Sequence, residues 1–230
     1  MKEESKSQIV AASPQVKICG LTTVAEALAC AELGASAIGL VFYPPSPRFV
    51  SDDLARAICQ ALPGSVWSVG VFVNQNAPDV LRWVNLCGLR AVQLHGQETP
   101  ELVRELHEYG VVVIKALFAN GRPAFSEAGS YTSSRAFLTE CFGERLPGGN
   151  GRMWNWAMAA NLTQRYPVIL AGGLTPDNVG EAIRAANPAV VDVSSGVEAQ
   201  PGRKDLNKVQ RFLAVVRQHE TASRFGMVFP

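Results

Sequence analysis

The sequence lacks a strong charge of either sign. Its 230 residues carry 21 Lys and Arg against 20 Asp and Glu, a formal net charge of +1 at pH 7. Broad electrostatic binding of DNA or RNA needs many clustered basic side chains, so this balance argues against a nucleic-acid partner. Long apolar runs are also missing, since none approaches the roughly 20 residues that span a bilayer, and we expect no membrane partner. A local basic site for a small anion is compatible with both absences.

Paired cysteines are absent as well. The five Cys form an odd set with no C-x-x-C spacing, and a chain of this length does not need disulfides. We therefore expect reduced thiols and a cytoplasmic protein. Residues 1–14 are polar and charged, without the apolar stretch of a signal peptide, which predicts a flexible N-terminal extension. Residues 221–230 are expected to form a C-terminal tail, with exposed apolar residues from 224 onward.

No low-complexity linker divides the chain, and no G-x-G-x-x-G follows the first predicted strand. The second absence disfavours a dinucleotide-binding fold. The chain instead alternates short apolar runs with helix-length amphipathic segments, and nearly continuous apolar runs are typical of buried parallel strands. The predicted strands lie at 16–19, 37–42, 66–73, 91–95, 111–116, 135–139, 168–171 and 190–194.

Helical segments separate these strands. Helices are expected at 22–33, 51–62, 78–86, 100–109, 153–165, 176–186 and 205–219. The segment 120–134 is rich in Gly, Ser and Pro and predicts only a short helix or a loop. Eight alternating units in a chain this short favour an α/β fold, a single-domain (β/α)₈ (TIM) barrel over residues 15–220. An open doubly wound sheet is the alternative.

Such a barrel has its active site at the C-terminal ends of the strands and in the loops after them. Cys19 ends the first predicted strand near a helix start, where the pKa of a thiol can be lowered. A small buried Cys is about equally compatible with this position. Arg48 follows two prolines in the loop after the second strand, and a guanidinium there can bind a carboxylate through two parallel hydrogen bonds. A solvated loop Arg fits as well.

Two further strand ends carry polar groups. Gln93 and His95 share one face of the fourth strand because strand side chains alternate, and a structural role for His95 fits slightly better than catalysis. The turns after the last two strands are rich in Gly and Ser, and barrels of this kind usually bind phosphate there. The residues expected to bind phosphate are Gly172, Gly173, Ser194, Ser195 and Gly196.

Six motifs then occur in one order along the chain. They are K-I-C-G at 17–20, F-Y-P-P-S-P-R at 42–48, V-G-V-F-V-N at 69–74, V-Q-L-H-G at 92–96 with its glutamine at 93, A-G-G-L at 171–174 and D-V-S-S-G-V-E at 192–198. From Val16 to about Phe212, the sequence resembles the phosphoribosylanthranilate isomerase family.

The resemblance implies a (β/α)₈ fold and an isomerase of tryptophan biosynthesis. The implied reaction is the Amadori rearrangement of N-(5′-phosphoribosyl)anthranilate to 1-(2-carboxyphenylamino)-1-deoxyribulose 5-phosphate. A small phosphoribosyl molecule is the implied substrate, and no metal or other cofactor takes part. By position in the motifs, Cys19 matches the general base, Arg48 the group that binds the anthranilate carboxylate, and Asp192 a residue that contacts the sugar. His95 is a further candidate for substrate binding.

One position departs from the family pattern. The family usually ends its sixth strand in Leu-Leu-Asp, with Asp as the general acid, followed by G-G-[ST]-G. Direct alignment puts Thr139 at the Asp position, with Glu140 next to it, and the later turn reads Gly-Gly-Asn-Gly at 148–151. Threonine is a poor proton donor at neutral pH, so we expect Glu140 to be the acid. Adjacent strand residues face opposite sides, so this role requires the strand to end or bulge at Glu140.

The two proton-transfer groups need opposite protonation states, and their environments must separate their pKa values. A lowered pKa at Cys19 would suit a base, and helix-end amides or nearby Lys17 would favour it. A raised pKa would suit the acid, and burial against the apolar barrel wall would favour that shift.

Alternatives remain open at this point. A related phosphoribosyl isomerase that accepts two substrates also fits, and so does a non-catalytic phosphosugar-binding barrel that has lost its acid. The departure at Thr139 and Glu140 keeps the second alternative open. Other phosphate-binding barrels fit less well: the sugar-phosphate isomerase of histidine synthesis typically uses two aspartates, whereas the first strand here ends in Cys19. The sequence is compatible with a monomer or a homodimer.

Overall fold

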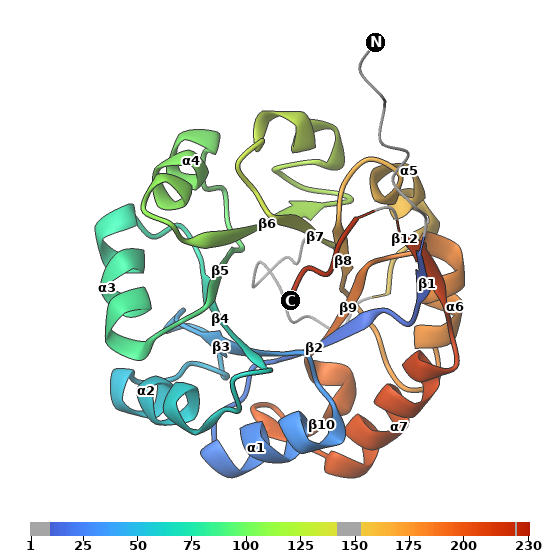
Figure 1. The fold of residues 1–230 in the computed structure, drawn as a ribbon, viewed down its shortest axis with the longest axis horizontal. Helices are drawn as coiled ribbons and strands as arrows, with labels where there is room; N and C mark the ends of the chain where they lie inside the picture. The colour runs from blue at the N-terminus through green and yellow to red at the C-terminus, as the bar shows by residue number, and fades with distance from the viewer. Residues whose placement is uncertain (1–9, 142–152, 224) are drawn as a thin grey trace.

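Eight parallel strands close into a barrel in chain order (Figure 1). The computed structural model describes residues 10–141, 153–223 and 225–230, and the Gly-Gly-Asn-Gly turn at 148–151 lies outside them. The last strand pairs with the first, so the predicted barrel is confirmed and the open sheet is wrong. The barrel strands are β2 (Gln15–Cys19), β3 (Ala37–Val41), β4 (Trp67–Phe72), β5 (Ala91–Leu94), β6 (Val112–Phe118), β7 (Ala136–Glu140), β8 (Val168–Leu170) and β9 (Val190–Val193).

Helices surround the barrel and cover the outer faces of its strands (Figure 1). They include α1 (Val24–Leu33), α2 (Asp52–Ala61), α3 (Ala77–Cys87), α4 (Pro100–Glu108), α6 (Val179–Ala186) and α7 (Leu206–Arg217). Several begin after a polar residue whose side chain accepts a hydrogen bond from a first-turn N–H, which stabilises the helix start. These capping residues are Thr23, Ser51, Asn76, Thr99 and Asp205.

Two predicted helical segments form little α-helix. The stretch 120–134 contains only the 3₁₀ turn η1 (Phe125–Ser130), as its Gly, Ser and Pro content indicated. The stretch 153–165 contains η2 (Trp156–Ala159) followed by the single turn α5 (Ala160–Thr163), so the continuous helix expected there is wrong. Indole groups of this second stretch bond to the turn after β8, as described below, and those bonds replace regular helix packing.

Strand alternation divides the core into two layers. Side chains of one parity, such as Ile38 and Val92, pack outward against the helices. Those of the other parity, such as Val69, Ile114 and Leu138, fill the barrel interior. Toward the C-terminal ends of the strands, several inward positions carry polar or ionisable side chains, among them Cys19, Glu140 and Asp192. The barrel is therefore a packed core with its chemistry confined to one end.

The C-terminal tail closes the opposite end of the barrel. Val228 and Phe229 are buried in the interior cluster, and the Phe229 ring lies 5.9 Å from the Trp67 ring. Gln15 binds the tail backbone, accepting from the N–H groups of Val228 and Phe229 and donating to the Phe229 carbonyl at 2.7 Å. Trp67 Nε1 donates to the carbonyl of Pro230 at 2.8 Å. The apolar end residues 228 and 229 were expected to be exposed, and the structure corrects this.

Two short strands join the chain ends near this plug. β1 (Val10–Ala12) pairs antiparallel with β12 (Thr221–Ser223). These segments were expected to lie in a flexible extension and a tail, and no strand was predicted in either. Three-residue strands leave almost no periodic signal, since their stability comes from pairing with a distant segment.

Among the described residues, no helix is long and apolar enough to cross a membrane.

Candidate active site

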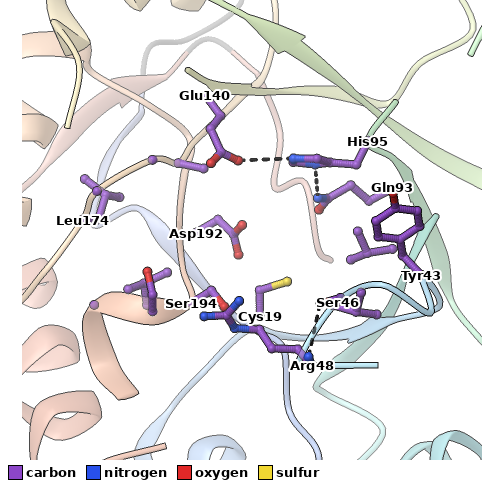
Figure 2. Close-up of a pocket in the computed structure, with 18 of the residues that line it drawn as sticks. Cys19, Tyr43, Ser46, Arg48, Gln93, His95, Glu140, Leu174, Asp192 and Ser194 are labelled. Carbon is purple, nitrogen blue, oxygen red and sulfur yellow. Dashed lines mark hydrogen bonds and ion pairs between the residues drawn. The ribbon is translucent and has the colours of Figure 1, made fainter. Parts of the chain in front are cut away.

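A pocket open to solvent lies at the C-terminal ends of the strands (Figure 2). It brings together every residue that the sequence analysis selected: Cys19, Arg48, His95, Glu140, Asp192, Gly172, Gly173, Ser194, Ser195 and Gly196. Cys19 comes from β2 and Glu140 from β7, which are not neighbours in the barrel, and both side chains point into the same cavity.

Cys19 lies at the inward-facing end of β2, next to the apolar side chains of Val41 and Val71. The sulfur fits because the neighbouring position on β3 is Gly39, where an added Cβ would lie 2.7 Å from Sγ. Burial raises the pKa of Cys19 above its ordinary value of 9.0; Lys17 lowers it and Asp192 raises it further. The lowered pKa considered from the sequence is therefore wrong: the resting side chain at neutral pH is a thiol.

Lys17 and Asp192 form a buried ion pair beneath the pocket floor. Lys17 Nζ lies 2.9 Å from Asp192 Oδ1, and the Lys17 side chain is completely buried. Burial lowers the pKa of Lys17, but Asp192 and Cys19 raise it by more, so the ammonium group stays charged. The pair holds the Asp192 carboxylate in the pocket and places a positive charge near the Cys19 sulfur. The sequence did not indicate the pairing of Lys17 with Asp192.

Arg48 is held by a carboxylate that the sequence analysis did not single out. Its Nε and Nη2 donate to Glu198 at 2.8 and 2.7 Å, and Glu198 also accepts from Lys204 Nζ at 2.8 Å. Burial lowers the pKa of Arg48, but the bonds to Glu198 raise it above its ordinary value. This fork fixes the guanidinium and leaves Nη1 for a ligand anion. Glu198 stood in a quoted motif, but only folding shows that it meets Arg48.

Glu140 faces the pocket through ordinary strand alternation. β7 pairs regularly with β6 as far as Phe118 and Glu140, and Leu138, two residues earlier, belongs to the barrel interior. Thr139 has the opposite parity and is completely buried outside the pocket, with Oγ1 pointing to the Ile169 carbonyl at 3.5 Å. No bulge or strand end is therefore needed for Glu140 to face the pocket, which corrects that condition.

His95 connects Glu140 to Gln93 along one side of the pocket (Figure 2). Its Nε2 lies 3.2 Å from Glu140 Oε2, and its Nδ1 lies 2.8 Å from Gln93 Nε2. The His95 and Phe118 rings are nearly perpendicular, with their centroids 5.7 Å apart. The predicted shared face of Gln93 and His95 is therefore observed, and the histidine contacts the candidate acid directly.

The two Gly and Ser turns form the opposite side of the pocket. Gly172 and Gly173 have φ of 86° and 71°, a region that L side chains rarely adopt. Two indoles hold this turn: Trp154 Nε1 donates to the Ala171 carbonyl at 2.9 Å, and Trp156 Nε1 donates to the Gly172 carbonyl at 3.1 Å. These tryptophans were not identified from the sequence, because their partners are backbone atoms of a distant turn.

The second turn, after β9, is equally restricted. A Cβ added at Gly196 would lie 1.8 Å from the carbonyl oxygen of Leu174, so only glycine fits. The neighbouring Ser194 Oγ is buried without a hydrogen-bond partner in the described part of the chain. Buried hydroxyls usually have hydrogen-bond partners, so this atom is placed to bind a ligand or water.

The described ranges contain no group of three or more His, Cys, Asp and Glu that could hold a metal ion.

Comparison with known proteins identifies close relatives. The family model for N-(5'phosphoribosyl)anthranilate (PRA) isomerase matches residues 16–215. An N-(5'-phosphoribosyl)anthranilate isomerase from Desulfatibacillum aliphaticivorans is 55% identical over 199 residues, covering 86% of this chain and 91% of the relative. A relative from Rubrobacter xylanophilus is 44% identical, covering 88% of this chain and 98% of the relative.

Solved structures agree. A phosphoribosyl anthranilate isomerase from Thermotoga maritima superposes with a TM-score of 0.82 at 38% identity, covering 90% of this chain and all of that one. Another similar structure, with a TM-score of 0.80 and the same coverage and identity, is described as a complex with reduced 1-(o-carboxyphenylamino)-1-deoxyribulose 5-phosphate. A third describes the Thermotoga maritima enzyme as dimeric.

Proposed function

The chain belongs to the N-(5′-phosphoribosyl)anthranilate isomerase family, and on this premise we propose that Cys19 and Glu140 carry out its two proton transfers. The protein is an isomerase of tryptophan biosynthesis that converts N-(5′-phosphoribosyl)anthranilate to 1-(2-carboxyphenylamino)-1-deoxyribulose 5-phosphate. The observation that carries the assignment is that a thiol and a carboxyl group from non-adjacent strands line one pocket.

The proposed substrate position follows from the polar groups of the pocket. The phosphate binds between the turn at Gly172 and Gly173 and the turn at 194–196, where backbone N–H groups and the Ser194 hydroxyl, which has no partner among the described residues, can bind it. The anthranilate carboxylate binds Arg48 through Nη1, because Glu198 occupies the other edge of the guanidinium. The sugar then lies between these two anchors, within reach of Asp192.

Glu140 acts first, as the general acid. Its carboxyl group gives a proton to the furanose ring oxygen as the bond from that oxygen to C1′ breaks. The electron pair of the bond stays on the oxygen, which becomes a hydroxyl, and the nitrogen lone pair forms a protonated Schiff base with C1′. A positioned acid contributes about 10²–10⁴ to such a step.

Cys19 acts second, as the general base. Its thiolate removes the proton from C2′, the C–H electron pair forms a C1′–C2′ double bond, and the nitrogen regains its lone pair. The resulting enaminol becomes the ketone when C1′ gains a proton and the C2′ hydroxyl loses one. Burial keeps the resting Cys19 protonated. Once the ring has opened, the positive charge of the Schiff base, together with Lys17, favours loss of the thiol proton to solvent, and the thiolate formed in this way is the base.

Paired substitutions test the assignment. Cys19→Ala should lower kcat by about 10²–10⁴ with little change in KM, since it removes a proton-transfer group. Cys59→Ala is the matched control, because Cys59 lies on α2 outside the pocket. The loss of substrate is followed by fluorescence, and a Cys19→Ala enzyme with normal turnover would contradict the proposal.

The acid is tested at two adjacent positions. Glu140→Gln keeps the shape of the side chain but removes its proton, and should also lower kcat by about 10²–10⁴. Thr139→Val changes the residue that direct alignment places at the family aspartate, and it should leave turnover nearly unchanged because Thr139 faces away from the pocket. The reverse result would assign the acid role to Thr139 or to a group it controls.

We further propose that the enzyme works in the cytoplasm, as a monomer or a homodimer. The roles proposed above use residues of a single chain. Sedimentation equilibrium measures the oligomeric state directly. Activity at dilutions that dissociate any dimer tests whether the monomer is sufficient; loss of activity on dilution would show that it is not.

A further inference from the structure

Three buried polar side chains form a line across one side of the pocket. Gln93 Nε2 lies 2.8 Å from His95 Nδ1, and His95 Nε2 lies 3.2 Å from Glu140 Oε2 (Figure 2). The three residues are only 1%, 6% and 5% exposed. Of these three residues, only Glu140 has a role in the proposed proton transfers, whereas Gln93 and His95 have none.

Two atoms of this line lack a well-aligned hydrogen bond among the described residues. They are Gln93 Oε1 and His95 Nε2, and both are buried. The contact from Nε2 to Glu140 is short enough for a hydrogen bond, but the N–H does not point straight at the oxygen. Catalytic hydrogen bonds are often misaligned without substrate and tighten in the complex. The line is therefore arranged for a state that includes the substrate.

The hydrogen-bond partner of one His95 ring nitrogen determines whether the other ring nitrogen carries the proton. A neutral imidazole has one protonated nitrogen and one acceptor nitrogen. The amide N–H of Gln93 donates to Nδ1, so Nδ1 is the acceptor and the ring proton lies on Nε2, facing Glu140. The edge contact with Phe118 fixes the plane of the ring. The reversed amide would place the ring proton on Nδ1 instead, so the tautomer depends on Gln93.

On the basis of the role proposed for Glu140, we infer that Gln93 is a positioning residue that holds the Nε2–H tautomer of His95. The Nε2–H group binds Oε2 of Glu140. A neutral carboxylic acid has one oxygen that accepts and one that carries the proton, so this bond leaves Oε1 as the proton donor. After the transfer, the same N–H stabilises the carboxylate. His95 thus selects which oxygen of the acid delivers the proton to the sugar.

Nitrogen NMR of the histidine rings tests the tautomer without reference to activity. The chain contains only three histidines, and His95→Gln identifies the signals of His95 by their loss. In the ¹⁵N-histidine-labelled full-length protein at neutral pH, we expect an acceptor signal from Nδ1 and a protonated signal from Nε2. A protonated Nδ1 in the wild-type protein would overturn the inference.

Two substitutions of Gln93 complete the spectroscopic test. Gln93→Leu removes the amide donor and should give a mixture of both tautomers. Gln93→Glu supplies an acceptor and should move the ring proton to Nδ1. Because the two variants differ in polarity, one remains informative if the other fails to fold. An unchanged Nε2–H tautomer in the folded variants would overturn the role of Gln93.

Steady-state kinetics separate this inference from the proposed function. Gln93→Leu and His95→Gln should lower kcat about tenfold or more, since each disturbs proton delivery, while KM changes little. His107→Gln, at an exposed position on α4, should retain wild-type kinetics. Normal kcat in Gln93→Leu despite a changed tautomer would overturn the inference and leave Glu140 as the acid. Normal turnover in Glu140→Gln would overturn the proposed function, whatever the tautomer of His95.

Discussion

The two ends of the barrel are built from the same strands but are filled in opposite ways. At the C-terminal end, Cys19, Glu140 and Asp192 surround an open cavity. At the N-terminal end, Val228 and Phe229 of the tail fill the interior and join its apolar core. One end therefore remains available to a ligand, whereas the chain itself occupies the other.

The difference shows how stability and chemistry are separated in this fold. At the N-terminal end, burial removes apolar surface from water, which stabilises by about 25 cal/mol per Å². At the mouth, polar atoms such as Ser194 Oγ and Gln93 Oε1 are buried without a hydrogen-bond partner among the described residues. Each such atom costs about 1–3 kcal/mol until a ligand or a water satisfies it. Substitutions at the two ends should consequently change different measurable quantities.

Apart from the proton-transfer residues, the largest expected effect is on stability, at the plugged end. Phe229→Ala leaves a cavity beside Trp67 and should lower the free energy of unfolding by about 3 kcal/mol. This value is at the lower end of the range for truncating a buried Phe, because a terminal segment can detach locally without global unfolding. Thermal unfolding should show Tm lower by about 6–12 °C. kcat and KM should stay at wild-type values; an altered kcat would show that the two ends are coupled.

The next effect is on binding, at the mouth. Arg48→Ala removes the proposed anthranilate anchor and should raise KM about 10–150-fold, since hydrogen bonds to charged groups contribute about 1.5–3 kcal/mol. A substrate analogue without the carboxylate provides the control and should lose little affinity in the variant. Equal losses for substrate and analogue would mean that Arg48 only supports the loop through Glu198.

The protonation state of Cys19 can be tested by its reaction with iodoacetamide. The rate of alkylation should be low at neutral pH and should increase about tenfold per pH unit, because the thiolate is the reactive form. Since burial raises the pKa of Cys19, the rise should continue above pH 9. Mass spectrometry of the modified peptide follows Cys19 separately from the other thiols. A rate that levels off below pH 8 would show a lowered pKa and an active resting thiolate.

The smallest effect concerns the charges beside the mouth. Burial raises the pKa of Glu198, but Arg48 and Lys204 hold it below its ordinary value of 4.5. The ionised Glu198 carboxylate stabilises the folded protein fully above the pKa of Glu198 in the unfolded state. This stabilisation is lost as the pH falls through the lower pKa of Glu198 in the folded state. The stability difference between wild type and Glu198→Gln should therefore narrow below about pH 4.5, measured by urea unfolding. Parallel curves would contradict this linkage.

Local sequence patterns were sufficient to predict most of the fold. The barrel strands were predicted because parallel strands buried on both faces read as apolar runs. β1 and β12 were missed because each is stabilised by the other, more than 200 residues away in the chain. The helix expected at 153–165 was wrong because the bonds of Trp154 and Trp156 to the turn after β8 decide the local structure.

The site was predicted less completely than the fold. Strand-end positions identified the pocket residues, but the pKa of Cys19 shifted opposite to expectation because its burial depends on side chains from other strands. Glu140 was selected on its chemistry, and strand parity placed it in the pocket without the bulge that alignment with Thr139 required. The pairing of Arg48 with Glu198 joins two loops, and a single sequence does not encode such a contact locally.

The tail plug also determines where the protein can be modified. Pro230 bonds to Trp67 at the start of β4, and Gln15 at the start of β2 binds the adjacent residues, so residues 228–230 lie on the face opposite the mouth. A fusion partner or immobilising linker attached after Pro230 would leave the path of the substrate clear. Such attachment would, however, act on the segment that seals the barrel, and a long flexible spacer would spare both functions.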